Sequence, residues 1–269
     1  GSRTPVSFLE SLAADSGRPV LAAAMFHSNT APDAVFDEIA AMDAATARGH
    51  PVWPQVSCCP LTMDFTMKSP YVFEGIEAWL PAMQAHGDAV RGVYADPAFR
   101  GQVKAALDAL RGKRLFNSEW DRVQVVAATR PEHRVFEGRD VAGLAAQAGR
   151  HPLDWLLDLA LSEDLETLFT AQLRNTDTQA VARLINHPSA HVSLSDAGAH
   201  LTFLCDAAFG LHLLGHWARD VGAIPLPQAV HKLTGHPAAI FGLVDRGVLR
   251  EGAHADLLLF DPAAVGRGP

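Results

Sequence analysis

The chain has 269 residues, of which 48% are hydrophobic and 19% are charged. This composition is typical of a globular protein with a buried core and excludes disordered and fibrous classes. The net charge of -8 is spread without long runs of one sign, so nucleic acid and membrane surfaces are not expected partners. The three cysteines, the missing signal sequence and the short apolar runs together favour a reducing, cytoplasmic location.

The first 59 residues alternate between helical and strand patterns. Apolar residues recur at helical spacing over 5–16 and 34–42, whereas 19–26 and 52–57 are short apolar runs typical of buried strands. Helix-strand-helix-strand order is typical of a parallel sheet covered by helices. We therefore predict that residues 1–59 form part of an α/β fold.

The regular alternation breaks in the middle of the chain. Residues 60–186 contain several helical patterns but only one convincing strand, at 123–128, and we predict an inserted, mostly helical region. A strand pattern resumes at 190–194. Residues 187–244 are accordingly predicted to hold the last strand of the sheet and its helices.

Two short strands are predicted near the end of the chain, at 246–249 and 255–260. The turn residues Glu251-Gly252 separate them, and Asp261-Pro262 ends the second. An isolated pair of strands is only marginally stable in water. We therefore expect residues 245–269 to complete a sheet whose other strands precede Gly1.

One carboxylate follows a predicted strand directly. Asp196 lies just beyond the strand at 190–194, and parallel barrels place their catalytic groups at the carboxyl ends of strands. There it could contact a metal ion and accept a proton from the metal-bound water, whose pKa is lowered. The alternative is that Asp196 only caps the following helix, and these residues alone leave both interpretations open.

Histidines are the other candidates. His27 ends the strand at 19–26 and could be a metal ligand, or it could be structural. His200 is four residues after Asp196 and could contact a substrate, or it could be a packing or capping residue. His212 and His216 share a helical face, but no glutamate accompanies them as in zinc proteases, which argues against a ligand role.

Cys58 and Cys59 close the strand at 52–57, so one of them could point toward the same end of the sheet. Buried structural cysteine is the favoured interpretation for both. A nucleophilic cysteine would need a basic partner, and the sequence identifies none.

Several motifs together are similar to those of a known family. They are Ser195-Asp196-Ala197-Gly198-Ala199-His200, Leu233-Thr234, Pro237-Ala238, Asp245-Arg246-Gly247, Ala255-Asp256-Leu257 and Phe260-Asp261-Pro262. They resemble the amidohydrolase superfamily, in particular its D-aminoacylase branch, the N-acyl-D-amino-acid deacylases. The run from Gly138 to Asp154 is similar to that branch too, so the resemblance covers nearly the whole chain, and its last third is the specific part.

The resemblance implies the carboxyl-terminal part of a (β/α)8 barrel of the TIM type, with a helical insertion and the terminal strands of a small β-sandwich. It also implies Zn²⁺ or another divalent metal ion. The family's catalytic aspartate falls on Asp196, which would also contact the metal, and a metal-binding histidine falls on His27. The remaining ligands would precede Gly1, so we expect this fragment to be inactive and to contact the missing segment or form a homo-oligomer.

Two departures from the family pattern concern the substrate. Asn29 stands where the deacylases usually carry a lysine that helps to bind the substrate carboxylate, and Ser57-Cys58-Cys59 stands where they tend to have a tyrosine. We expect Asn29 and His200 to contact the substrate. The predicted activity is metal-dependent hydrolysis of a non-peptide C–N bond, as in an N-acyl amino acid or related amide. The alternatives are a non-catalytic degenerate barrel or interaction module, and a cyclic-amide hydrolase of the same superfamily.

Overall fold

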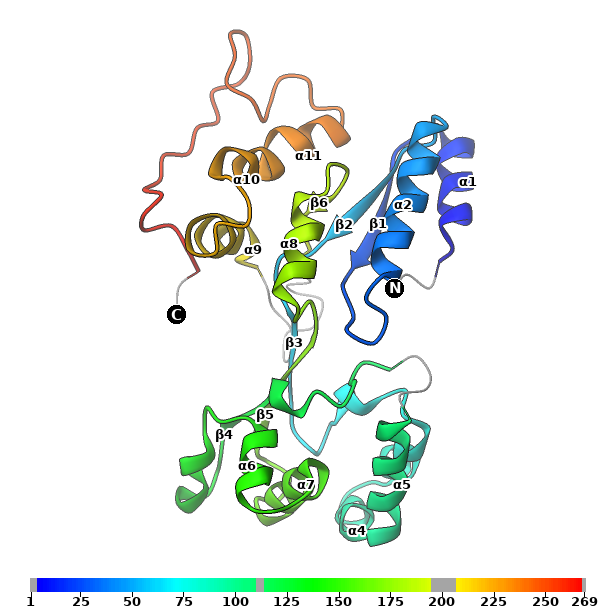
Figure 1. The fold of residues 1–269 in the computed structure, drawn as a ribbon, viewed down its shortest axis with the longest axis vertical. Coiled ribbons are helices and arrows are strands. Elements are labelled where there is room, and N and C mark those ends of the chain that lie inside the picture. Colours follow the sequence, from blue (N-terminus) through cyan, green and yellow to red (C-terminus); the bar gives the residue numbers. More distant parts are fainter. Residues whose placement is uncertain (1–3, 110–113, 195–206, 268–269) are drawn as a thin grey trace. The chain divides into compact units, whose positions relative to one another are not determined.

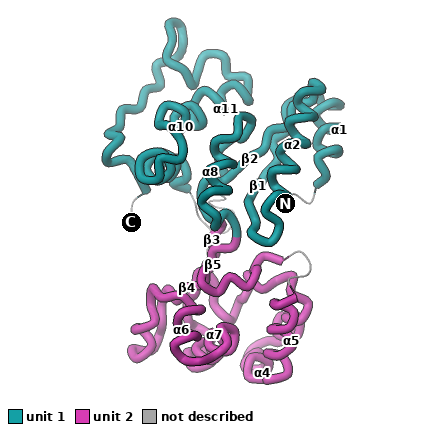
Figure 2. The backbone as a smooth tube through the Cα atoms, viewed as in Figure 1, with its two compact units in different colours: residues 1–60, 174–200, 205–269 teal, residues 61–173, 201–204 magenta. Residues whose placement is uncertain are grey.

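The chain divides into two units, each with its own core (Figure 2). The computed structural model describes residues 4–109, 114–194 and 207–267. Unit 1 combines residues 1–60, 174–200 and 205–269, whereas unit 2 consists mainly of the continuous stretch 61–173. Within residues 4–194, the chain leaves unit 1 after Pro60, forms unit 2, and returns to unit 1 at Arg174.

Unit 1 is built on a parallel sheet with strand order β1-β2-β6 (Figure 1). Its strands are β1 (Val20–Met25), β2 (Val52–Val56) and β6 (His191–Val192). Its helices are α1 (Val6–Ser16), α2 (Ala34–Ala47), α8 (Thr178–Asn186), α9 (Phe209–His212), the π-helix η5 (Leu213–Asp220), α10 (Leu226–Leu233) and α11 (Gly235–Ile240).

The two faces of this sheet differ in burial. Along β2, Val52 and Val56 are fully buried, whereas the intervening Trp53 and Gln55 remain partly exposed. Successive strand residues point to opposite faces, so one face is covered and the other only partly. The covered face packs in one apolar cluster with α2 residues such as Met42, because apolar positions three and four apart share a helix face.

Unit 2 has a three-stranded sheet with order β3-β5-β4, in which β4 and β5 are antiparallel. The strands are β3 (Leu61–Phe65), β4 (Val123–Ala127) and β5 (Leu168–Arg174). The α-helices are α3 (Leu80–Gln84), α4 (Ala89–Ala95), α5 (Pro97–Asp108), α6 (Val141–Gln147) and α7 (Pro152–Ser162). Short 3-10 helices are η1 (Tyr71–Phe73), η2 (Glu77–Trp79), η3 (Trp120–Arg122) and η4 (Pro131–Phe136).

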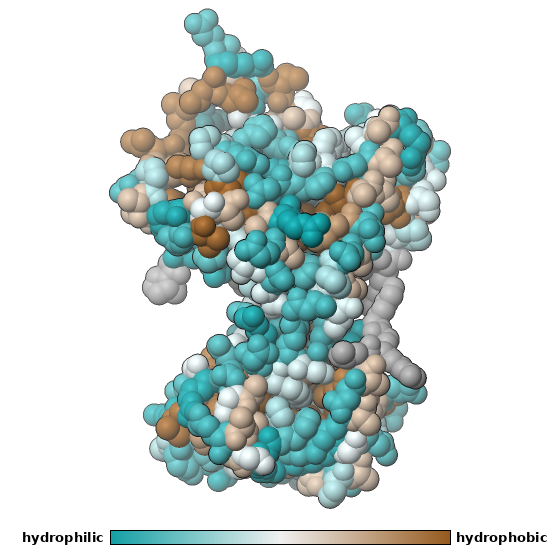
Figure 3. Space-filling model, viewed as in Figure 1, coloured by the Kyte–Doolittle hydropathy of each residue, from teal (hydrophilic) through white to brown (hydrophobic). Residues whose placement is uncertain are grey.

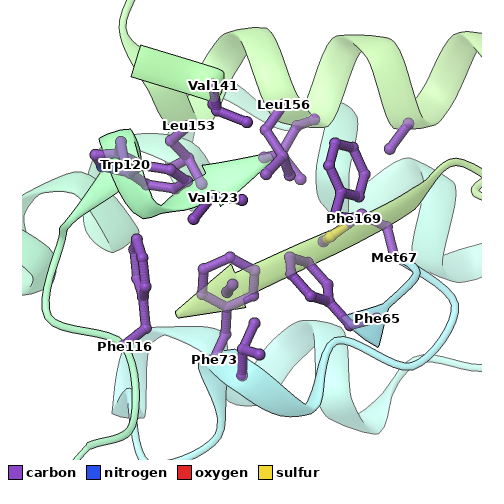
Figure 4. Close-up of a cluster of buried hydrophobic side chains, with 14 of the residues drawn as sticks. Phe65, Met67, Phe73, Phe116, Trp120, Val123, Val141, Leu153, Leu156 and Phe169 are labelled. Carbon is purple, nitrogen blue, oxygen red and sulfur yellow. The ribbon is translucent and has the colours of Figure 1, made fainter. Parts of the chain in front are cut away.

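Aromatic side chains fill the core of unit 2 (Figure 4). Phe73 stacks on Trp79 with ring centroids 4.3 Å apart, and Phe65 of β3 stacks on Phe169 of β5 at 5.5 Å. Such pairs add to the stabilisation that apolar burial provides. The core thus joins the first and last strands of the unit, although they are about a hundred residues apart in the sequence.

Much of the predicted order of elements is confirmed. The helices and strands expected in the first 59 residues are present as α1, β1, α2 and β2, and the strand at 123–128 is β4. The prediction of only one strand between residues 60 and 186 is wrong, because β3 and β5 flank the helices of this region. Helix α8, expected within the insertion, belongs to unit 1.

The two strands predicted near the end are not formed. Residues 241–267 are irregular in the structure, including 246–249 and 255–260. Their apolar side chains are largely exposed, with Leu249 at 87% and Leu259 at 97%, and hydrophobic surface gathers over this segment (Figure 3). Residues that favour strands need a neighbouring strand to pair with, and no described strand lies beside these.

No helix in the described parts of the chain has both the length and the apolar character needed to cross a membrane.

Candidate functional site

The carboxyl ends of the three strands of unit 1 lie at one edge of the sheet. Met25 of β1 pairs with Val56 of β2, which in turn pairs with Val192 of β6. His27 and Cys58 each follow these paired positions by two residues, so they belong to adjacent strand ends. This edge is the candidate site, because ligands of parallel sheets bind at the carboxyl ends of strands.

His27 is buried at this edge, with only 4% of its surface exposed. Its ring nitrogen Nδ1 is buried and has no hydrogen-bond partner among the described residues. The ring lies 6.5 Å from that of Phe36, measured between centroids. A buried imidazole nitrogen without a partner is costly unless something binds it, so His27 fits the role of a metal ligand.

Asn175 connects the ends of β1 and β2. Its side-chain oxygen accepts a hydrogen bond from the backbone N–H of His27 at 2.7 Å, and its backbone N–H donates to the carbonyl of His27 at 3.1 Å. Its side-chain nitrogen donates to the carbonyls of Ser57 (2.9 Å) and Cys59 (3.2 Å). The residue is itself buried and adopts a left-handed backbone conformation with φ of 55°.

Asn29, predicted to contact the substrate, is exposed in the loop that follows His27. Its side-chain nitrogen donates to the hydroxyl of Thr176 at 3.0 Å. Next along the chain, Asp177 caps α8 by accepting from the N–H of Ala180. The segment 175–177 therefore binds the end of β1 and starts the helix that precedes β6.

The end of β2 is held by hydrogen bonds that involve both cysteines. The Cys59 N–H donates to the Ser57 hydroxyl at 3.0 Å, and the Trp217 indole donates to the Cys58 carbonyl at 2.7 Å. The Cys58 thiol donates to the Phe209 carbonyl. Both cysteines are buried, which agrees with the structural role expected for them.

Asp196 and His200 lie outside the described residues. The second described range ends at Leu194, two residues past β6. Just before it, the Ser193 N–H donates to the Val56 carbonyl at 3.0 Å. Leu194 has a φ of 78°, a conformation that side chains with a Cβ rarely adopt and that is found at functional turns. Among the described residues, no group of three or more His, Cys, Asp or Glu side chains could hold a metal ion.

A second pair of histidines lies on helices, with His212 at the end of α9 and His216 in η5. The rings of His212 and His216 stack with centroids 4.6 Å apart. Burial, together with the neighbouring Arg267 and His216, lowers the pKa of His212 to about 4. That neither histidine binds the metal stays a prediction.

Asn175 and Thr176 are the site residues that the sequence analysis missed. The hydrogen bond between His27 and Asn175 joins positions 148 residues apart, so no local spacing points to it. The string Asn175-Thr176-Asp177 ahead of a helical pattern indicates a helix start at Asp177, which is the one signal available.

Comparisons with known proteins place the chain in a family. Residues 85–269 match the amidohydrolase family. An uncharacterised protein of Mycobacterium tuberculosis is 31% identical over 199 residues, covering 71% of this chain and 32% of the relative. A D-aminoacylase of Alcaligenes xylosoxydans xylosoxydans is 58% identical over 53 residues, covering 20% of this chain and 11% of that enzyme.

A crystal structure of D-aminoacylase has a similar fold, with a TM-score of 0.51 and 20% sequence identity. The similarity covers 96% of this chain and 43% of that one. The chain thus spans less than half the length of the proteins that it matches. The mixed α/β architecture and the family match agree with the resemblance in the motifs, and the chain belongs to the amidohydrolase family.

Proposed function

We propose that the protein containing this chain is a metal-dependent amidohydrolase that cleaves a non-peptide C–N bond of a small molecule. The observation that carries the proposal is His27, a buried histidine at a strand end with an unpartnered ring nitrogen, in a chain that belongs to the amidohydrolase family. In this proposal β1, β2 and β6 are the last three strands of a (β/α)8 barrel. Their parallel pairing and the partly exposed second face support that assignment.

In the proposed reaction His27 holds a divalent metal ion together with Asp196 and with ligands from outside this chain. When bound, such an ion lowers the pKa of a coordinated water to about 7 and polarises the amide carbonyl. Asp196 would accept a proton from the attacking water as the C–O bond forms, and would then donate it to the leaving nitrogen as the C–N bond breaks. Both transfers need a carboxylate.

The proposed substrate class is an N-acyl amino acid or a related amide. The support is the 58% identity with a D-aminoacylase over 53 residues. Asn29 and His200 are proposed to contact the substrate. Asn29 carries no charge where the deacylases usually have lysine, so we expect a weaker preference for substrates with a free carboxylate than a lysine would give.

The experiment uses the longest protein that the gene encodes, because the chain spans only 43% of the similar D-aminoacylase. Divalent-metal content is measured together with hydrolysis of a panel of N-acyl amino acids, their neutral amides and cyclic amides, in wild type and in Asp196→Asn. Exposed Asp15→Asn on α1 is the matched control. We expect bound metal in wild type, and a loss of at least about 10²-fold in kcat in Asp196→Asn, the scale of general acid–base catalysis.

A wild-type protein that binds no divalent metal and cleaves no amide would contradict the proposal and favour the non-catalytic alternative. Cleavage restricted to cyclic amides would place the activity in the other branch of the superfamily. Equal losses in Asp196→Asn and Asp15→Asn would show that Asp196 has no special part in the reaction.

A further inference from the structure

We infer that Asn175 is a positioning residue that holds His27 in its ligand orientation. The inference rests on the proposed function, because it assigns His27 to the metal. Asn175 lies in unit 1, just after the chain returns from unit 2. The evidence is the set of hydrogen bonds that Asn175 makes with two strand ends.

Asn175 bonds both backbone groups of His27. The His27 N–H donates to the Asn175 side chain at 2.7 Å, and the His27 carbonyl accepts from the Asn175 N–H at 3.1 Å. These two bonds fix the peptide planes on either side of the His27 Cα atom. The direction of the Cα–Cβ bond, and with it the position available to the imidazole, follows from those planes.

The same amide group also fixes the neighbouring strand end. Its nitrogen has two N–H donors, and the two carbonyls that it contacts are those of Ser57 and Cys59. The buried amide is therefore satisfied on both its oxygen and its nitrogen. A residue that uses both polar atoms of its side chain to join the ends of β1 and β2 keeps His27 in a constant position relative to the neighbouring strand.

Asparagine suits this position for two separate reasons. Its backbone φ of 55° lies in the left-handed region, which asparagine tolerates better than most residues with a side chain. Its amide supplies an acceptor and a donor at once. Aspartate has a similar shape but no N–H, so Asn175→Asp would set a carboxylate against the Ser57 and Cys59 carbonyls. Glycine would keep the backbone conformation and remove the side-chain bonds.

Unit 1 contains a matched control at the end of α8. The Asn186 side chain also donates to two carbonyls, those of Ala182 and Ala223, both at 2.8 Å. Neither of these belongs to the strand ends that carry the candidate site. Asn186→Asp therefore repeats the chemical change of Asn175→Asp and costs stability without disturbing His27.

The test measures Zn²⁺ affinity by chelator competition in the longest protein that the gene encodes, for wild type, Asn175→Asp, Asn175→Gly and Asn186→Asp. Urea unfolding of each variant confirms that the protein assayed is folded. Loss of a group that orients a metal-binding histidine typically weakens metal binding about 10- to 100-fold. We therefore expect both Asn175 variants to bind Zn²⁺ more weakly by about that factor, with the affinity of Asn186→Asp unchanged. Folded Asn175→Gly with wild-type Zn²⁺ affinity would overturn the inference.

A second readout needs no metal. The hydrogen-exchange rate of the His27 amide is measured in the metal-free proteins, and we expect it to rise about tenfold or more in Asn175→Gly, the equivalent of one lost hydrogen bond. A wild type that binds no Zn²⁺ would contradict the proposed function. In that case an unchanged exchange rate in Asn175→Gly would contradict the positioning role as well, and a faster rate would support it.

Discussion

Glu163 is a buried carboxylate in unit 2 with donors from three sides. It accepts hydrogen bonds from the N–H groups of Thr129 (2.7 Å) and Arg130 (3.0 Å) and from the His133 ring (2.7 Å). Burial raises the pKa of this carboxyl group, but the hydrogen bonds to its charged form outweigh burial and lower the pKa to about 2. The ionised side chain thus holds the turn at 129–133 against the end of α7.

The pKa of Glu163 predicts a pH dependence of stability. The group has an ordinary pKa of 4.5 and a pKa of about 2 in the folded protein. Its stabilisation is therefore complete above pH 4.5 and is lost as the pH falls from 4.5 toward 2, where the folded state also takes up the proton. Glu163→Gln should lower the free energy of unfolding at pH 7 by about 2 to 3 kcal/mol.

Urea unfolding at pH 7 and at pH 3 tests this prediction. Glu166→Gln is the control, because Glu166 forms an exposed ion pair with Lys68 in the same turn region, and such pairs contribute about 1 kcal/mol or less. The difference in unfolding free energy between wild type and Glu163→Gln should shrink at pH 3. A difference that is equal at both pH values would contradict the assigned role of the charge.

Single residues of the site were predictable only where a local pattern marks them. His27 could be located because it ends an apolar strand pattern, and the structure places it at the strand edge with its ring nitrogen unpartnered. Asn175 could not, because its role comes from bonds to strands that precede it by more than a hundred residues. Local spacing carries no information about contacts of that kind.

The π-helix η5 provides a test of packing between elements. A Cβ atom at Gly215 would lie 2.5 Å from the carbonyl oxygen of Val265, so the carboxyl-terminal segment crosses this helix where there is no side chain. Arg219, one turn further along, donates to the carbonyls of Ala263 and Val265. The glycine and the arginine together hold residues 263–265 against the helix.

Gly215→Ala should therefore destabilise unit 1 by about 1 to 3 kcal/mol, because the extra methyl group meets backbone that must move. Gly210→Ala in α9 is the matched control. A Cβ at Gly210 would have ordinary contacts, 3.6 Å from a methyl group of Leu233, and alanine favours helix. Urea unfolding measures the stability of both variants. Equal stability of the two would show that residues 263–265 can move to accommodate the methyl group without loss of unfolding free energy.

Helices and strands were predictable where the apolar pattern of their sequence matches their burial in the folded protein. The strand β5 carries a clear alternation, with Phe169, Ala171 and Leu173 buried between partly exposed residues, and this signal could have found the strand. The segments at 246–249 and 255–260 show the opposite case. Their residues favour strands, yet strands form only where a partner lies alongside, and sequence pattern alone does not identify the partner.

At the scale of the whole molecule, the continuous stretch 61–173 forms nearly all of unit 2. Its first and last strands belong to one sheet, and its aromatic core lies wholly within this stretch. A continuous segment with its own core and with its ends in one sheet has what an independent domain requires. We therefore expect residues 61–173 to fold when produced alone.

Near-ultraviolet circular dichroism and urea unfolding of residues 61–173 test this expectation. The buried Trp79 and Trp120 should give a fixed aromatic signal that disappears in one cooperative transition. A fragment of residues 61–166 is the control, because it lacks β5 and the stacking of Phe169 on Phe65 and should not fold. A sloping curve without a transition for residues 61–173 would contradict the independence of unit 2.

The return of the chain at Asn175 also sets an order of events during protein synthesis. Chains are made from the amino terminus, and domains generally fold as units as they emerge from the ribosome. The strand ends at His27 and Cys59 leave the ribosome first. Their hydrogen bonds to Asn175 can form only after another 148 residues beyond His27 have been made. Unit 2 can fold during that interval. The candidate site is thus assembled last, after the nascent chain has made an entire domain.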